Sequence, residues 1–221
     1  MSLRQIETVS LRAQALSAIR TGIVLGEIKP GVIYSAPSIA AQLGVSPTPV
    51  REAMTELAAE GVVTAVRNKG FRIAEITDGD LDEIFQLRVM LEAPSVAQLT
   101  GLLDDPTLDA LEGAINSMKA ASERQDLVGY LEADRTFHLT LLARYGNGRL
   151  VRIVDRLREQ TRLHGLPNLI GVGGQGETTL IAEHEQILAA LTGSDPNEVE
   201  RLMRSHLRHT RGIWAGLNED A

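Results

Sequence analysis

The stretch Ser35-Ala-Pro-Ser-Ile-Ala-Ala-Gln-Leu-Gly-Val-Ser-Pro-Thr-Pro-Val-Arg-Glu-Ala-Met-Thr-Glu-Leu57 predicts two short helices joined by a tight turn. Gly44 ends the first helix, because a residue without a Cβ atom takes the left-handed conformation after a helix at little cost. Ser46 is suited to cap the second helix, and Pro47 suits its first position, where no amide hydrogen bond is lost. Apolar residues recur every three or four positions, so each helix packs one face inward. The stretch is therefore a predicted helix-turn-helix.

The residues that follow predict a β-hairpin. Glu60-Gly61 ends the second helix, residues 62–66 are rich in β-branched side chains, and residues 67–70 form a turn before a second strand at 71–73. A hairpin directly after a helix-turn-helix is a wing, and cations at its tip can lie along DNA phosphates or reach a minor groove. The cations of this hairpin are Arg67, Lys69 and Arg72. The order of helix, turn, helix and basic wing favours DNA binding over a packing unit with surface cations.

The outward face of the second helix carries the polar residues Thr48, Arg51, Glu52 and Thr55. The second helix of a helix-turn-helix enters the major groove of DNA with its N-terminal residues forward. This face is therefore the one that we expect to meet DNA.

The residues quoted so far resemble the DNA-binding domain of GntR-family bacterial transcription regulators, over about residues 10–76. The matching segments are Val45-Ser-Pro-Thr-Pro-Val-Arg-Glu-Ala53, Glu60-Gly61 and Lys69-Gly70-Phe71. The resemblance implies that Thr48 and Arg51 contact DNA and that the wing tip assists. The candidate DNA-binding residues are Ser46, Thr48, Arg51, Lys69 and Gly70.

This chain departs from that family at two positions. Pro47 stands where the family commonly has arginine, and Ala36 stands where an acidic residue is usual. The missing arginine removes a base or phosphate contact, so the operator sequence of relatives cannot be carried over to this chain.

Composition limits the class of protein. The chain has 221 residues with 43% hydrophobic content, enough for one large or two modest domains with a buried core. Cysteine is absent, which rules out disulfides and thiolate metal sites and fits a reducing compartment. No leader and no apolar run of membrane-spanning length is found, so we expect a cytoplasmic protein without a membrane anchor.

The charge is divided unevenly between the two parts of the chain. The net charge is −7, yet residues 1–76 hold eight Lys and Arg against six Asp and Glu, a charge of +2. The remainder holds fourteen against twenty-three, a charge of −9. Because the acidic part cannot lie against phosphates, DNA binding is expected from the N-terminal part alone.

Beyond a boundary at residues 76–80 the pattern predicts helices without a convincing strand, in an all-helical bundle of six or seven helices. Thr77 or Asp78 is expected to cap the first of them, and Pro94 to kink or split it before it continues to Leu103. We therefore predict a mainly α protein, with a winged helix-turn-helix domain at 1–76 and an all-helical domain at 77–221. The expected helices start near Ser10 and, in the bundle, cover about 81–103, 106–118, 126–142, 150–161, 178–191 and 197–217, with a glycine-rich loop at 164–176.

Three of the five histidines are predicted to lie on the apolar, inward faces of their helices. His138 follows Asp134 by four residues, so both lie on one face of a helix, while His184 and His206 lie on the last two helices. A buried carboxylate with three imidazoles is costly unless a divalent metal holds them, and Zn²⁺, Ni²⁺ or Mn²⁺ takes such ligands. The alternative is a set of ordinary core or surface side chains. His164, in a loop, and His209, rotated away from His206, are not expected to be ligands.

The second part of the chain resembles the FCD ligand domain of FadR-like GntR regulators over residues 78–217. The resemblance implies that Asp134, His138, His184 and His206 bind a divalent metal, usually zinc, and that a small carboxylate effector completes its coordination. Arg88 would then bind the effector's carboxylate, and the alternative for Arg88 is a salt bridge to Glu92 on the same helix. The matching residues are Arg88, Glu92, Asp134, His138, Asn147, His184 and His206.

We therefore expect a metabolite-responsive transcription regulator, a homodimer that binds an inverted-repeat operator in double-stranded DNA. Most relatives are repressors released by their effector, although the sequence does not fix the sign of regulation. Three alternatives are weighed: a sensor in which the metal itself is the signal, an architectural DNA binder, and a metal-dependent hydrolase. The hydrolase is disfavoured because no His-Glu-x-x-His motif appears, and Glu183 and Glu185, which flank His184, point away from its face.

Overall fold

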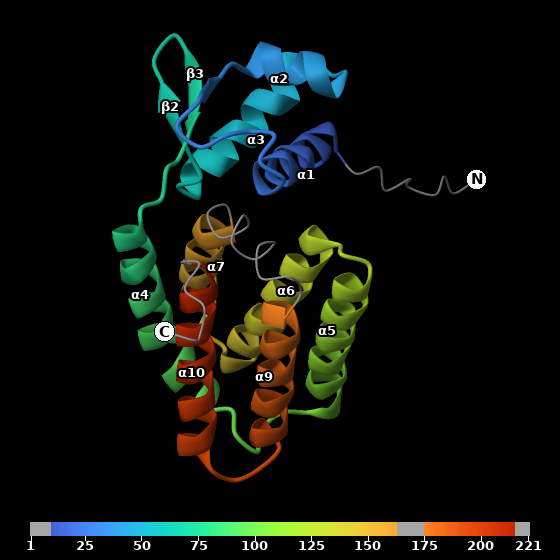
Figure 1. Cartoon of the computed structure of the whole chain (residues 1–221), viewed down its shortest axis with the longest axis vertical. Helices are drawn as coiled ribbons and strands as arrows, with labels where there is room; N and C mark the ends of the chain where they lie inside the picture. Colours follow the sequence, from blue (N-terminus) through green and yellow to red (C-terminus); the bar gives the residue numbers. More distant parts are fainter. Residues whose placement is uncertain (1–9, 163–174, 215–221) are drawn as a thin grey trace, which may run out of the picture. The chain divides into compact units, whose positions relative to one another are not determined.

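The structure is a computed structural model that describes residues 10–162 and 175–214 of the chain (Figure 1). The chain divides into two compact units, the first ending at Glu75 and the second beginning at Ile76. The first unit contains three helices and a small three-stranded sheet, and the second contains helices and no strand among its described residues. The prediction of a mainly α protein with a winged helix-turn-helix and a helical bundle is confirmed.

The first unit is built on the predicted helix-turn-helix. Helices α1 and α2 both pack against α3, and the hairpin follows α3 directly. Their apolar faces form the core of the unit, with Ile19, Ile39, Val50, Met54 and Leu57 all buried. The elements of this unit are α1 (Leu11–Val24), β1 (Ile33–Tyr34), α2 (Ala36–Leu43), α3 (Pro47–Ala59), β2 (Val63–Val66) and β3 (Gly70–Ile73).

The turn between α2 and α3 has the predicted chemistry. Gly44 follows α2 with φ at +67°, the left-handed conformation that glycine adopts without strain. Ser46 is the N-cap residue of α3, but its side chain makes no hydrogen bond to the start of the helix. The exposed hydroxyl of Ser46 is therefore not committed to capping.

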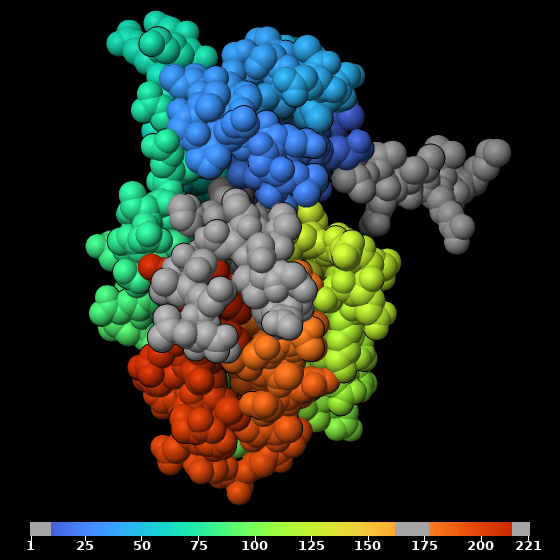
Figure 2. All heavy atoms as spheres, in the orientation of Figure 1, coloured from blue at the N-terminus to red at the C-terminus, as the bar shows by residue number. Residues whose placement is uncertain are grey.

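The sheet has the antiparallel order β1-β3-β2, and the short strand β1 was not predicted. Tyr34 pairs with Phe71, which brings β1 against the strand that Gly70 begins. Gly70 has φ at +132°, and a Cβ atom there would clash with the backbone oxygen of Tyr34. Strand pairing by itself therefore requires glycine at this position. In Figure 2 the β2–β3 turn stands out from the rest of its unit.

The second unit is a bundle of six helices in the part of the chain that the structure describes. Helix α5 packs along α6, α4 packs along α10, and α9 packs against both α5 and α10. Helix α7 lies against α4 and α6. The helices are α4 (Asp78–Ala97), α5 (Asp105–Glu123), α6 (Leu127–Tyr145), α7 (Gly148–Arg162), α9 (Gln175–Leu191) and α10 (Pro196–Trp214). The glycine-rich loop expected at 164–176 falls largely outside the described residues, and α9 begins at Gln175, earlier than expected.

Helix α4 differs at its C-terminal end from the helix that the sequence predicts. Thr77 caps α4 as predicted, in a reciprocal pair with Asp80. Pro94 lies inside the helix, which neither splits there nor runs on to Leu103, but ends at Ala97. The chain leaves the helix through short turns, and the amide of Gly101 donates instead to the carbonyl oxygen of Leu191 at 2.8 Å. The chain therefore runs to the end of α9 over the residues for which the sequence predicted further helix.

Among residues 10–162 and 175–214, no helix combines the length and the apolar character that a membrane span requires.

Candidate metal centre

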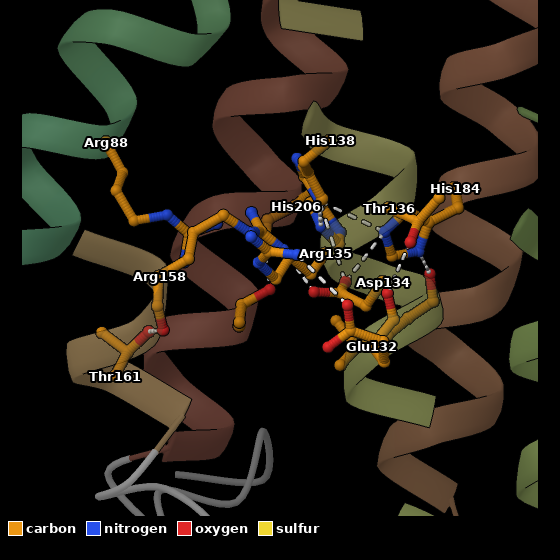
Figure 3. Close-up of polar contacts among 12 residues, drawn as sticks. Arg88, Glu132, Asp134, Arg135, Thr136, His138, Arg158, Thr161, His184 and His206 are labelled. Atoms are coloured by element: carbon orange, nitrogen blue, oxygen red, sulfur yellow. Dashed lines mark hydrogen bonds and ion pairs between the residues drawn. The ribbon is translucent and has the colours of Figure 1, made fainter. Parts of the chain in front are cut away.

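The structure brings together the four side chains that the sequence predicted as metal ligands. Asp134 and His138 lie one turn apart on α6, His184 lies on α9 and His206 on α10, and their side chains converge between these helices (Figure 3). One ligand atom from each lies within 4.8 Å of the others. The three histidines are buried, with at most 2% of the residue exposed, while Asp134 is only partly covered.

The spacing of these atoms suits an ion at their centre. His138 Nε2 lies 3.3 Å from Nε2 of His184 and 3.3 Å from Nε2 of His206. Asp134 Oδ1 lies 3.2 Å from His184 Nε2 and 3.8 Å from His138 Nε2. Ligands at bond lengths of 2.0–2.1 Å around a tetrahedral ion are separated by about 3.3 Å. The two separations from His138 to the other imidazoles and the separation from Asp134 to His184 match this value, so the donor set suits a divalent ion such as Zn²⁺.

The opposite nitrogen of each imidazole faces an oxygen atom. Nδ1 of His184 lies 2.6 Å from the carbonyl oxygen of Leu180, and Nδ1 of His206 lies 2.8 Å from Glu183 Oε2. Nδ1 of His138 lies 2.9 Å from Glu92 Oε2. For His184 and His206 such acceptors hold the proton on Nδ1 and leave the lone pair of Nε2 for a metal, whereas Nδ1 of His138 makes no hydrogen bond despite its short distance from Glu92. The three lone pairs then point at one another, an arrangement that a cation stabilises.

The charges of the cluster are those that a metal site needs. Burial lowers the pKa of His138 to about 3 and that of His206 to about 4, so both imidazoles are neutral near pH 7. Burial would raise the pKa of Asp134, but the guanidinium of Arg158 and the hydrogen bond from His184 together outweigh it and hold that pKa well below its usual range. His138 and His206 thus offer neutral imidazoles and Asp134 an ionised carboxylate, the protonation states that bind divalent metals.

A buried ion network lies beside the cluster. Glu92 is completely buried, and its Oε1 accepts a hydrogen bond from Arg88 Nε at 2.7 Å. Its Oε2 accepts one from Arg158 Nη1 at 3.3 Å, and Nη2 of Arg158 contacts Asp134 Oδ2. Burial would raise the pKa of Glu92, but Arg88 and Arg158 lower it on balance, so this carboxylate is ionised. Glu92 therefore links both arginines to the ligand His138.

Arg88 makes the salt bridge to Glu92 that was the alternative to effector binding, and it also lines a cavity. Only its Nε is used by Glu92, and no acceptor within the described ranges bonds to its two terminal nitrogens. The cavity is small, about 20 Å³, enough for about one water molecule. It is lined by Arg88, Leu131, Asp134, Arg135, Arg158, Thr161, His206 and Thr210. Two candidate metal ligands, Asp134 and His206, and three guanidinium groups therefore line the same cavity.

Sequence reasoning missed two residues of this site. Arg158 was not singled out, although Val154 and Thr161 on the same buried face of α7 mark its position by helical spacing. Glu183 was expected to point away from His184. It makes no contact with that ring, but its carboxylate binds His206 and, at 2.7 Å, Nδ1 of His209 on the neighbouring helix.

The remaining predictions near the site have simple outcomes. His209 lies outside the cluster, as expected, and His164 lies outside the described residues. Asn147 accepts hydrogen bonds from the amides of Arg149 and Leu150 and so starts α7.

The candidate DNA-binding residues lie on the first unit. Ser46, Thr48 and Arg51 are exposed at the start and along the outer face of α3, and Lys69 is exposed at the wing tip. Gly70 is half-buried within β3, where the close approach of the Tyr34 backbone leaves no room for a Cβ atom. The inward face of α3 is fully packed, so its outer face is the one available to the major groove.

Comparison with known families gives two matches along the chain. Residues 11–73 match the model of the bacterial regulatory proteins of the gntR family, and residues 83–209 match that of the FCD domain. A transcriptional regulator from the TAR-I ttuE-ttuC′ intergenic region of Agrobacterium vitis is 38% identical over 58% of this chain and 77% of its own. The probable D-xylose utilization operon transcriptional repressor of Paenarthrobacter nicotinovorans is 28% identical over 92% of this chain and 88% of its own.

The fold has a close counterpart among solved structures. The Escherichia coli McbR/YncC structure superposes with a TM-score of 0.79 at 25% identity, and covers 94% of this chain and 98% of its own. The matched families and these relatives are transcription regulators, so the hydrolase alternative is set aside.

Proposed function

Since this chain belongs to the gntR family of bacterial regulatory proteins and carries an FCD domain, we propose that it is a transcription repressor controlled by a small carboxylate. In this proposal residues 1–76 bind DNA, and residues 77–221 bind a divalent metal and the effector and form the dimer. The protein acts in the cytoplasm, on the chromosome. The observation that carries the proposal is the convergence of three imidazole Nε2 atoms and Asp134 Oδ1 beside an arginine-lined cavity.

DNA recognition is assigned to the outer face of α3 and to the wing. Thr48 and Arg51 are exposed there and read base edges or phosphates, while Lys69 holds the backbone. The uncommitted hydroxyl of Ser46 supplies a further contact at the start of the helix. Gly70 contributes by allowing the close strand approach that sets the position of Lys69.

The metal is assigned to Asp134, His138, His184 and His206. Zn²⁺ is the leading candidate, because three nitrogens and one oxygen at these spacings match its tetrahedral sites. Ni²⁺ and Mn²⁺ take the same ligands at a higher coordination number, which would leave positions open to an acid.

The effector is assigned to the cavity. The two terminal nitrogens of Arg88 form a planar fork that can donate two parallel hydrogen bonds to one carboxylate. Because Asp134 and His206 line the same cavity, an acid held by Arg88 lies next to the metal position. The small volume favours a short acid or the carboxylate end of a longer one.

Dimer formation is assigned to α4 and α7, which pack side by side. Their outer surface exposes large apolar side chains, with Leu87 47%, Met90 62% and Ile153 49% exposed. Large exposed apolar side chains on two neighbouring helices support an interface there. A two-fold dimer presents two recognition helices, so the operator is an inverted repeat.

A metal-sensing regulator is the second candidate. Four protein ligands already complete the tetrahedral coordination of zinc, which would leave no position for an acid. In that case the metal itself is the signal, and its binding is weak and reversible. A metal that survives dialysis against buffer would instead be a permanent part of the site.

The test is metal analysis of the purified full-length chain, followed by thermal melts against a panel of small carboxylic acids. Stoichiometric metal and a raised melting temperature with one acid are expected, since a ligand that binds only the folded chain stabilises it. Metal that binds but is lost on dialysis, without a response to any acid, would favour the sensor. Absence of both would contradict the metal and effector parts of the proposal and leave DNA binding to be tested separately.

A further inference from the structure

Arg158 occupies a place between the candidate ligands and the cavity that no sequence pattern assigned to it. Its side chain is 6% exposed, and it lines the cavity from α7. Nη2 contacts Asp134 Oδ2, and Nη1 lies 3.3 Å from Glu92 Oε2. A buried guanidinium with two carboxylate partners is well satisfied as long as both partners keep their negative charge available.

The two oxygens of Asp134 have different tasks. Oδ1 faces the imidazoles, 3.2 Å from His184 Nε2, while Oδ2 is taken by Arg158. Arg158 therefore leaves Asp134 one oxygen that could hold an ion.

An ion at the centre changes the surroundings of Arg158. The negative charge of Asp134 would be shared with a divalent cation held there, and that charge would repel the guanidinium of Arg158 beside it. Glu92 remains a partner, but it is already bound by Arg88 and faces His138. With metal bound, the carboxylates beside Arg158 would balance less of its positive charge than they do without metal. The unbalanced charge would face the cavity that Arg158 lines.

We propose that Arg158 is the second anchor of the effector carboxylate, beside Arg88, and that metal binding at Asp134 makes this anchor available. This inference rests on the function proposed above. Under this proposal the protein binds the metal first and the acid second. By linkage, the factor by which metal strengthens acid binding is the factor by which the acid strengthens metal binding.

The order can be tested on the full-length chain with acetate, the smallest acid that carries the needed carboxylate and a methyl reporter. Acetate affinity is measured by ligand-observed NMR with the chain saturated with zinc and with the chain freed of zinc by a chelator. We expect zinc to strengthen acetate binding about tenfold, within the usual range of coupling between two sites.

The role of Arg158 is tested with Arg158→Gln, and Arg156→Gln is the matched control. Arg156 is exposed on the same helix, so the control makes the same change in charge away from the cavity. At saturating zinc, Arg158→Gln is expected to keep its metal and to bind acetate at least about tenfold more weakly, because a charge-assisted contact is lost. Arg156→Gln is expected to bind acetate as the unmodified chain does.

Arg158→Lys covers the case in which the glutamine variant does not fold. It keeps the charge but loses the planar fork, and is expected to fold, hold zinc and bind acetate with intermediate affinity. Zinc content is measured in every sample.

Each contrary result has a definite meaning. Equal acetate affinity in the unmodified chain and in zinc-loaded Arg158→Gln would overturn the anchor. Equal affinity with and without zinc in the unmodified chain would overturn the order. Loss of zinc from both Arg158 variants would make Arg158 a support for Asp134 rather than an anchor for acid, and would also overturn the inference. If the unmodified chain takes up neither zinc nor acetate, the proposed function itself is wrong.

Discussion

Glu183 Oε2 accepts a hydrogen bond from His206 Nδ1 at 2.8 Å, from one helix to the next. The same carboxylate binds Nδ1 of His209 through its other oxygen at 2.7 Å. Burial would raise the pKa of Glu183, but its hydrogen bond from His206 contributes to a net lowering, so it is ionised. An ionised acceptor on Nδ1 fixes the orientation of the His206 ring and strengthens Nε2 as a ligand.

Glu183→Ala is therefore expected to weaken zinc binding by about 10–100-fold, the usual cost of losing such a partner. Glu185→Ala is the control, because Glu185 is exposed two residues away and pairs with Lys119 at the surface. Competition with a chromogenic zinc chelator measures both affinities. Similar zinc affinities in the two variants would show that Glu183 does not support the ligand.

His184→Ala removes one of the four candidate ligands while leaving the α9 backbone a good helix former. The variant is expected to fold and to lose stoichiometric zinc, together with any thermal response to acids. Mass spectrometric metal analysis measures the zinc, and circular dichroism checks the helices. Gln186→Ala, an exposed change on the same helix, serves as the control. A folded His184→Ala chain that still holds one equivalent of zinc would mean that the ligands are misassigned.

Arg51→Ala tests the recognition helix. Arg51 is exposed on α3, and losing one good base contact costs about 1–3 kcal/mol, or roughly 5- to 150-fold in affinity. Electrophoretic mobility shifts on an operator selected from random duplexes measure the loss, and metal binding should be unaffected. Arg124→Ala, an exposed change in the second unit, is the control for charge. Operator affinity that does not change in Arg51→Ala would rule out this face of α3.

Lys69→Ala tests the wing in a different way. A contact to phosphate carries no sequence information, so its loss should weaken selected and random duplexes alike. The slope of log affinity against log salt concentration should fall by about one unit. Fluorescence anisotropy over a series of salt concentrations measures that slope. If only the selected duplex loses affinity, Lys69 reads bases rather than phosphates.

Leu87→Glu with Met90→Glu tests the proposed dimer surface on α4. Both side chains are already exposed in the single chain, so their replacement should leave the monomer folded. Two carboxylates in an apolar interface should shift the chain from dimer to monomer in sedimentation velocity experiments. Leu102→Glu, at a side chain that is 65% exposed between α4 and α5, is the control. A doubly substituted chain that remains a dimer would place the interface elsewhere.

The features that could be read from the sequence are local ones. Gly44 and Thr77 mark helix ends by backbone rules that hold within a few residues. Asp134 and His138 share a helix face because of their four-residue spacing, and that needs no knowledge of the neighbouring helices.

What the sequence did not show depends on contacts between helices. Ile153 fits an apolar stripe, but it is 49% exposed, because α7 turns Val154 and Arg158 inward instead. Glu183 was discounted for facing away from His184, yet α10 brings His206 to it. After α4 ends at Ala97, the amide of Gly101 donates to the carbonyl oxygen of Leu191, which lies far along the chain. Spacing along one helix cannot reveal which residue of another helix will be opposite.

The candidate ligands come from α6, α9 and α10, and Glu92 ties α4 to them through His138. With an ion bound by these ligands, none of these helices could separate from the others without breaking a bond to the ion or to its support. Metal loading should therefore slow the opening of the bundle and its cleavage by proteases, in addition to preparing it for an acid. A cell short of zinc would then degrade this regulator faster, and the amount of regulator, as well as its response, would follow the supply of the metal.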